Sequence, residues 1–264
     1  MFLAMAVISA GQAHGGLLYS EHAGSTLQTI DTDTLAFPNI IGPSGVATQI
    51  NGLAYDPNAD ILYGIDSVGV GGLYTINRST GAASFIGVTG GFNLQGLAFD
   101  SLNNVLYATE TFVNGGLFEI NPSTGASTRV GTLASAIAGL AYDSLNDQLV
   151  GSGVGTGDLF GLNRATAAQA LLFDGPLSAT DGLAYDPDKN LFWSIGATNE
   201  VYSYDPSNGF ARTVHPQTLT TFRSLAYVSS AATIPEPSSI VLLGVGLVGL
   251  AVGVTRRRLG SRSG

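Results

Sequence analysis

The sequence contains no cysteine and little charge. Its 264 residues include 36 glycines, and only 11% of them are charged. Without cysteine the chain forms neither a disulfide framework nor a thiolate metal site. Apolar residues make up 45% of the chain and recur along its whole length, which excludes an intrinsically disordered protein. A chain of this length can bury a hydrophobic core without further cross-links.

Basic residues are also scarce. Four of the ten lie in a tail that follows an apolar run: Arg256, Arg257, Arg258 and Arg262. With these and Glu236 set aside, six basic residues remain against eighteen acidic ones. Nucleic-acid binding needs clustered Lys and Arg to displace counterions from phosphates. The acidic body therefore excludes nucleic acid as a partner.

The first 13 residues resemble an export signal. Residues 2–10 are apolar, and Gly11 and Ala13 stand at the −3 and −1 positions that a signal peptidase reads, just before His14. No Lys or Arg precedes the apolar run, so the signal is either atypical or truncated. The alternative is an N-terminal strand. We predict a signal peptide over residues 1–13.

A second apolar segment lies near the other end. Residues 238–255 are apolar or small, and three arginines follow directly, from Arg256 to Arg258. This length is marginal for a transmembrane helix, which needs about 20 residues. Under the positive-inside rule the arginines would stay cytoplasmic and the body would lie outside. We predict a short membrane-spanning helix here, with a basic tail at 256–264.

The motif Pro235-Glu236-Pro237 stands immediately before this segment. The order of Pro-Glu-Pro, short hydrophobic segment and arginine cluster closely resembles the PEP-CTERM sorting signal of Gram-negative bacteria. The resemblance covers residues 231–264 and implies transient insertion in the inner membrane and processing by an exosortase near the motif. It further implies association with the cell surface and extracellular polysaccharide. A plain C-terminal membrane anchor is the alternative.

The region between these two ends is built from repeats. A five-residue motif of the form Gly-Leu-Ala-aromatic-Asp recurs at intervals of 42 to 44 residues. Each copy is followed by three more short apolar runs, separated by polar or glycine-rich turns. Four short strands joined by turns indicate one antiparallel sheet per repeat. The copies begin at Gly52, Gly96, Gly139, Gly182 and, more loosely, Ser224.

Four strands in a repeat of this length are typical of a β-propeller blade. The segment Leu17–Gly42 supplies only strands two to four of a blade, and the missing first strand is Ser224–Tyr227. We therefore predict an all-β, five-bladed propeller over residues 14–230, with the two ends sharing one blade. Residues 17–228 are similar to the bacterial propeller superfamily of YVTN, NHL and quinoprotein-like repeats. That similarity implies a fold and no particular activity.

Catalytic motifs are missing from the sequence. The three histidines are His14, His22 and His215, and there is no Gly-x-Ser-x-Gly or His-Glu-x-x-His motif. The aspartates that end each motif, Asp56, Asp100, Asp143 and Asp186, are followed by turn residues, which predicts that they cap their own backbone. We therefore assign no catalytic, cofactor-binding or metal-binding residue from sequence motifs.

One set of positions differs between repeats, as a binding site would. The residues just before each first strand and at the end of each second strand should meet at one mouth of the axial channel. Such a polar mouth could hold a sugar, another small polar ligand or a hard cation such as calcium. The alternative is a solvated funnel without affinity. The candidate residues are Asn51, Gln95, Asp181 and Arg223 before first strands, and His22, Asp66 and Glu110 at the ends of second strands.

Two function classes follow. The first is an exported, exosortase-processed surface or matrix protein whose propeller binds a polysaccharide or surface protein. The second is a secreted propeller enzyme, either a lactonase-like hydrolase or a quinoprotein-like oxidoreductase. The second would need convergent metal-binding carboxylates or a cofactor platform, and the chain has a single tryptophan, Trp193, to build a platform from.

Overall fold

The computed structural model describes residues 15–22, 25–36, 39–68, 71–90, 93–112, 114–176, 180–196, 200–215 and 223–230. Residues from Gly15 to Ser229 form one compact unit. The predicted signal peptide and sorting signal, including Pro235, Glu236, Pro237 and Arg256 to Arg258, lie outside the described residues.

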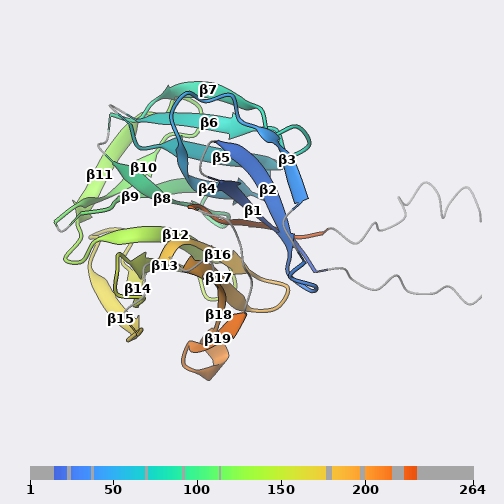
Figure 1. Ribbon diagram of the computed structural model, residues 1–264. Coiled ribbons are helices and arrows are strands. Elements are labelled where there is room, and N and C mark those ends of the chain that lie inside the picture. The colour runs from blue at the N-terminus through green and yellow to red at the C-terminus, as the bar shows by residue number, and fades with distance from the viewer. Residues whose placement is uncertain are drawn as a thin grey trace, which may run out of the picture. The chain divides into compact units, whose positions relative to one another are not determined.

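The compact unit is a five-bladed β-propeller, as the repeats predict (Figure 1). Each blade is a sheet of four antiparallel strands, and a single 3-10 turn, η1 (Pro206–Asn208), is the only helical element in the described part of the chain. The sheets are, in strand order from the axis outward: β20 (Ala226–Val228), β1 (Leu17–His22), β2 (Thr26–Asp31) and β3 (Asn39–Pro43); β4 (Ile50–Asp56), β5 (Ile61–Asp66), β6 (Gly72–Ile76) and β7 (Ala83–Val88); β8 (Leu94–Asp100), β9 (Val105–Glu110), β10 (Gly116–Ile120) and β11 (Ser127–Thr132); β12 (Ile137–Asp143), β13 (Gln148–Gly153), β14 (Leu159–Leu162) and β15 (Gln169–Phe173); β16 (Thr180–Asp186), β17 (Leu191–Gly196), β18 (Val201–Asp205) and β19 (Ala211–His215).

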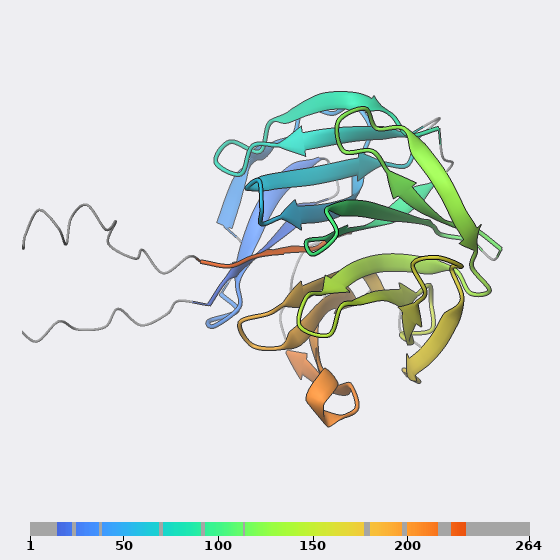
Figure 2. The ribbon, with the colours of Figure 1, turned by 180° about the vertical axis from the view of Figure 1, so that it is seen from behind.

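The two ends of the propeller close the ring in one shared sheet. Strand β20 pairs antiparallel with β1, with Leu18 opposite Tyr227 and Tyr19 opposite Ala226. Both views show the red strand β20 beside the blue strand β1 (Figure 1, Figure 2). The predicted closure is therefore confirmed.

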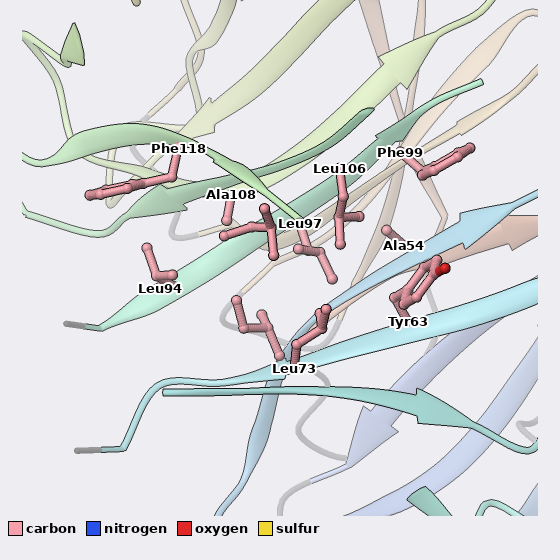
Figure 3. Close-up of a cluster of buried hydrophobic side chains, with 11 residues drawn as sticks. Ala54, Tyr63, Leu73, Leu94, Leu97, Phe99, Leu106, Ala108 and Phe118 are labelled. Carbon is pink, nitrogen blue, oxygen red and sulfur yellow. The ribbon is translucent and has the colours of Figure 1, made fainter. Parts of the chain in front are cut away.

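Apolar side chains fill every gap between neighbouring sheets. Five buried clusters correspond to the five gaps, so each blade packs on both of its neighbours. Figure 3 shows one of them, in which Leu73 from β6 lies against Leu97 from β8 and Leu106 from β9. The innermost strands carry continuous apolar runs such as Leu53-Ala54-Tyr55, because both of their faces are covered by other sheets.

The aspartates that end the innermost strands cap the turns that follow. The Asp56 carboxylate accepts hydrogen bonds from the backbone N–H of Asn58 at 2.8 Å and Ala59 at 3.1 Å. Asp100, Asp143 and Asp186 accept the two equivalent backbone bonds in their own blades. The predicted capping role is confirmed, and these turns repeat with the same geometry around the ring.

Glycine at the start of the repeated motif allows the innermost strands to approach one another. A Cβ at Gly139 would lie 2.6 Å from Ser152 Oγ and 2.7 Å from the backbone nitrogen of Leu183 in the next blade. A Cβ at Gly52 would lie 2.1 Å from the carbonyl oxygen of Gln95. No side chain fits at these positions without moving a neighbouring strand.

We expect Gly139→Ala to destabilise the protein by about 3 kcal/mol, since the added methyl group must separate β12 from β16. Gly90→Ala is the control: its φ of +70° costs about 1 kcal/mol of backbone strain, but apart from its two chain neighbours no atom of the described residues lies within 4 Å of the added Cβ. Chemical denaturation of the two variants measures both values. Equal destabilisation would contradict the packing role of Gly139.

Removal of the closing strand should destabilise the whole ring. Truncation after Phe222 removes the buried side chains of Leu225, Tyr227 and Val228 and leaves β1 as an open edge. We expect a loss of about 6 kcal/mol, enough to lower the melting temperature by more than about 10 °C. A chain that ends at Ser230 keeps β20 and should melt like the full chain. Identical melting of both truncations would show that the shared blade does not stabilise the ring.

Candidate functional site

The axis of the propeller is a narrow channel lined by the repeated motif. Its cavity has a volume of about 60 Å³, and three residues from each blade line it: a leucine, an alanine and an aromatic residue. These residues lie at three levels along the axis, five to each level. The levels are Leu53, Leu97, Leu140, Leu183 and Leu225; Ala54, Ala98, Ala141, Ala184 and Ala226; and Tyr55, Phe99, Tyr142, Tyr185 and Tyr227.

The predicted polar mouth lies at the end of the channel where the innermost strands begin. Its cavity is only about 10 Å³ and is lined by Asn51, Gln95 and Ser224 together with the neighbouring glycines and leucines. A space of this size holds about one water molecule. In each of the four blades with a complete motif, the residue before the glycine is the extra residue of a β-bulge in the first strand pair.

The amides at this mouth bind their own blades. Asn51 Nδ2 donates to the carbonyl oxygen of Gln49 at 3.2 Å and also to Ser67 Oγ. Gln95 Nε2 donates to Asn93 Oδ1 at 3.2 Å. Arg223 is exposed, and its backbone N–H donates to the carbonyl oxygen of Glu21 at 3.3 Å.

The two second-strand carboxylates are buried and hold the following hairpin turns. Asp66 accepts hydrogen bonds from Thr48 Oγ1 at 2.8 Å, Tyr74 Oη at 2.9 Å and the backbone N–H of Gly72 at 3.1 Å. Glu110 Oε2 accepts from the backbone N–H of Gly116 at 2.7 Å. Both carboxylates therefore have a structural role within their blades.

A shared carboxylate site at this mouth stays a prediction. The described residues contain no group of three or more His, Asp or Glu side chains placed to hold a metal ion. The side chain of Asp181 lies outside the described ones, and His22 ends β1 in a half-buried position. Calcium would have to bind with Asp66 and Glu110 still engaged in their hairpins.

Glu21 is a buried carboxyl group that the sequence analysis missed. It is fully buried in β1, and neither of its carboxyl oxygens has a hydrogen-bond partner among the described residues. Burial raises its pKa to about 8. The repeat offers a signal that could have found it, because the equivalent residues in the other blades are Ile65, Thr109, Ser152 and Ile195.

The opposite end of the channel opens into a larger cavity, which we call the aromatic mouth. It has a volume of about 120 Å³ and lies where the innermost strands end. In the sequence, its aromatic residues are distinguished only as members of the repeated motif. The lining consists of Tyr55, Phe99, Tyr142, Tyr185 and Tyr227, with Pro57, Ser101, Ser144, Pro187 and Ser229 outside them.

Each tyrosine of the aromatic mouth donates its hydroxyl proton to an acceptor in a turn. Tyr55 donates to Asp60 and Tyr142 to Asp147, both at 2.7 Å. Tyr185 donates to Asn190 at 2.8 Å, and Tyr227 donates to Asp188 of the neighbouring blade at 2.7 Å. Burial and the bond to Asp60 raise the pKa of Tyr55 to about 12, so its phenol stays protonated at physiological pH.

Comparison with protein families identifies the C-terminal signal. Residues 233–258 match the PEP-CTERM protein-sorting motif. The sequence has no significant match among curated proteins. In the part of the chain that the structure describes, no helix is long and apolar enough to span a membrane, and the predicted span at 238–255 lies outside that part.

Solved structures with the same fold are distant in sequence. A chain of the nidogen/laminin complex superposes with a TM-score of 0.56 at 15% identity, over 82% of this chain and 99% of that one. A protein of unknown function from Bacteroides thetaiotaomicron gives 0.54 at 14% identity, over 78% of this chain and 58% of that one. TolB from Acinetobacter baumannii gives 0.52 at 14% identity, over 81% and 66%. At these identities the comparisons establish the fold alone.

The chain is therefore a five-bladed β-propeller protein. It carries a PEP-CTERM sorting motif, which marks it as an exported substrate of an exosortase.

The buried Glu21 should make stability fall as pH rises. Its pKa is about 8 in the folded protein and 4.5 in a model peptide, so between these values the unfolded chain loses a proton that the folded protein keeps. Stability then decreases by up to about 1.4 kcal/mol per pH unit across that range. We expect Glu21→Gln to remove this slope in denaturation curves recorded from pH 5 to pH 8. Glu119→Gln, at an exposed position of β10, should keep the slope of the parent. Parallel profiles for the parent and Glu21→Gln would contradict a neutral buried Glu21.

Proposed function

We propose that this protein is displayed at the cell surface or in the extracellular matrix and that its propeller is a binding module without catalytic activity. The observation that carries the proposal is the joining of a sorting motif at residues 233–258 to a closed ring that ends at Val228. Such a protein reaches the outside of the cell as a folded, acidic domain that offers its two axial mouths and its rim to other molecules.

The chemistry of the channel supports binding over catalysis. The axial cavity is small, about 60 Å³, and the residues that line it are leucine, alanine and aromatic residues, with no histidine or acidic residue among them. The carboxylates next to it, Asp56 and Asp66 among them, are engaged in turns of their own blades. Because these carboxylates accept hydrogen bonds from their own turns, their contacts support a structural role.

The candidate partners are other molecules of the cell surface. The exosortase acts on the chain first, while the hydrophobic segment is in the inner membrane. The processed protein then meets extracellular polysaccharide and surface proteins, which are the classes of partner that its location would provide.

Processing is tested on the native surface fraction of a producing bacterium. If an exosortase cleaves near Pro235, mass spectrometry should find propeller peptides but none from residues 240–264. Replacement of Pro235, Glu236 and Pro237 by alanine should retain those C-terminal peptides in the membrane fraction. Ser239→Ala, which leaves the motif intact, should be processed like the parent. An intact C-terminus in the surface fraction would overturn the proposal in favour of a permanent anchor.

A further inference from the structure

The aromatic mouth combines aromatic rings with carboxylates that accept hydrogen bonds from three of its tyrosines. Five rings, one from each blade, surround a cavity of about 120 Å³. An apolar cavity of roughly 150 Å³ is sufficient for benzene, so this one can hold a group of four to six heavy atoms. Aromatic rings attract cations through their negative faces. The carboxylates that accept hydrogen bonds from the phenols add to that attraction, because a phenol that donates to a carboxylate has a more electron-rich ring.

The chain already builds a cation site of this kind twice around the mouth. In the first, Tyr55 donates to Asp60, and the Arg78 guanidinium pairs with that carboxylate while lying 5.2 Å from the ring centre of Tyr55. In the second, Tyr142 donates to Asp147, and Arg164 pairs with Asp147 at 2.8 Å. The Arg164 guanidinium lies 5.8 Å from the ring centre of Tyr142. Each site therefore consists of a tyrosine, a carboxylate and a guanidinium.

A third tyrosine and carboxylate pair has no such cation. Asp188 accepts hydrogen bonds from Tyr227 Oη at 2.7 Å and Ser229 Oγ at 2.6 Å, which are both neutral donors. Among the described residues no Lys or Arg pairs with Asp188, and the adjacent Lys189 reaches away to Asp33 and Thr32. Tyr227 and Ser229 both line the cavity, so the Asp188 carboxylate that they bind lies beside it and keeps its negative charge.

We propose that the aromatic mouth binds a guanidinium group beside Asp188, Tyr227 and Tyr185. The group comes either from a small alkylguanidine or from an arginine side chain of a peptide. In this position it completes a third set of tyrosine, carboxylate and guanidinium. The ligand in the cavity supplies the guanidinium that Arg78 and Arg164 supply in the other two sets. This inference rests on the proposed function, in which the propeller is a binding module, and it names the chemical class of the ligand.

Calorimetric titration of the purified full chain with ethylguanidinium chloride tests the proposal directly. We expect saturable binding that weakens as salt is added, because exposed charges are screened. Ethylurea, a neutral molecule of nearly the same shape, should bind at least about tenfold more weakly. This comparison uses the unaltered protein and so does not depend on the folding of any variant. Equal binding of the two probes, or no saturable binding of ethylguanidinium, would overturn the proposal.

Substitution locates the site. Asp188→Asn keeps an acceptor for Tyr227 and Ser229 but removes the charge, and it should weaken ethylguanidinium binding by about tenfold or more. Asp174→Asn makes the same change of charge at an exposed residue after β15 and should bind like the parent. A melting temperature for each variant verifies the fold. Unchanged binding by folded Asp188→Asn would overturn the proposed site.

A short peptide with one arginine and otherwise neutral residues separates the two sources of the guanidinium. Tighter binding of the peptide than of ethylguanidinium indicates a protein partner, and equal binding indicates that the free group is sufficient. Failure of all these titrations with normal C-terminal processing would reject the guanidinium site and leave the surface role intact. Binding of ethylguanidinium by a chain that is never processed would support the guanidinium site and reject the proposed surface role.

Discussion

The close approach of five innermost strands at one axis is the constraint on which the rest of this structure depends. Strand β4 contacts β8, β8 contacts β12, β12 contacts β16, and β20 completes the ring between β16 and β4. In four of the five strands the neighbouring strand leaves no room for a Cβ at the start of the motif, which places glycine there, and the fifth strand has Ser224 at this position. The strands that meet in this way leave an axial cavity of only about 60 Å³, around which the leucine and alanine of each motif lie.

Because the axial cavity is narrow, a ligand can bind only at the ends of the channel. These two ends differ chemically. Where the innermost strands begin, beside the bulges, short polar residues line a space for about one water. Where they end, the same repeat presents aromatic residues whose hydroxyl groups are held by turn residues such as Asp60 and Asn190. The polar mouth is therefore nearly closed, and the aromatic mouth is the more open of the two.

The sequence was sufficient to predict the architecture because the fold is periodic. A motif recurring every 42 to 44 residues gave the blades, and the phase of Leu17–Gly42 against Ser224–Tyr227 gave the closure, which the pairing of β1 with β20 confirms. Periodicity also gave the turn-capping role of the motif aspartates. Periodicity also predicts that strand-end carboxylates meet at the polar mouth. Asp66 and Glu110 accept hydrogen bonds from the hairpins of their own blades, and the shared site stays a prediction.

Departures from the repeat carry information that composition and motif searches do not. Glu21 replaces an apolar or small residue at a buried position, and its raised pKa follows from packing that only the folded ring creates. The pairing of Tyr227 with Asp188 crosses from one blade to the next, so no local pattern could predict it. Both features lie in or beside the shared blade, where the chain is least constrained to follow its own repeat.

The order of segments along the chain couples ring closure to sorting. Strand β20 is the last strand to be synthesised among those of the described residues, and it ends at Val228, five residues before the sorting motif begins at residue 233. A ring that lacks β20 would expose the β1 edge, and open edges favour pairing with other chains. Cleavage near Pro235 falls beyond Val228 and beyond Ser229, the residue whose hydroxyl binds Asp188. Processing can therefore release the sorting signal while the closing strand and the rim of the aromatic mouth stay in the folded domain.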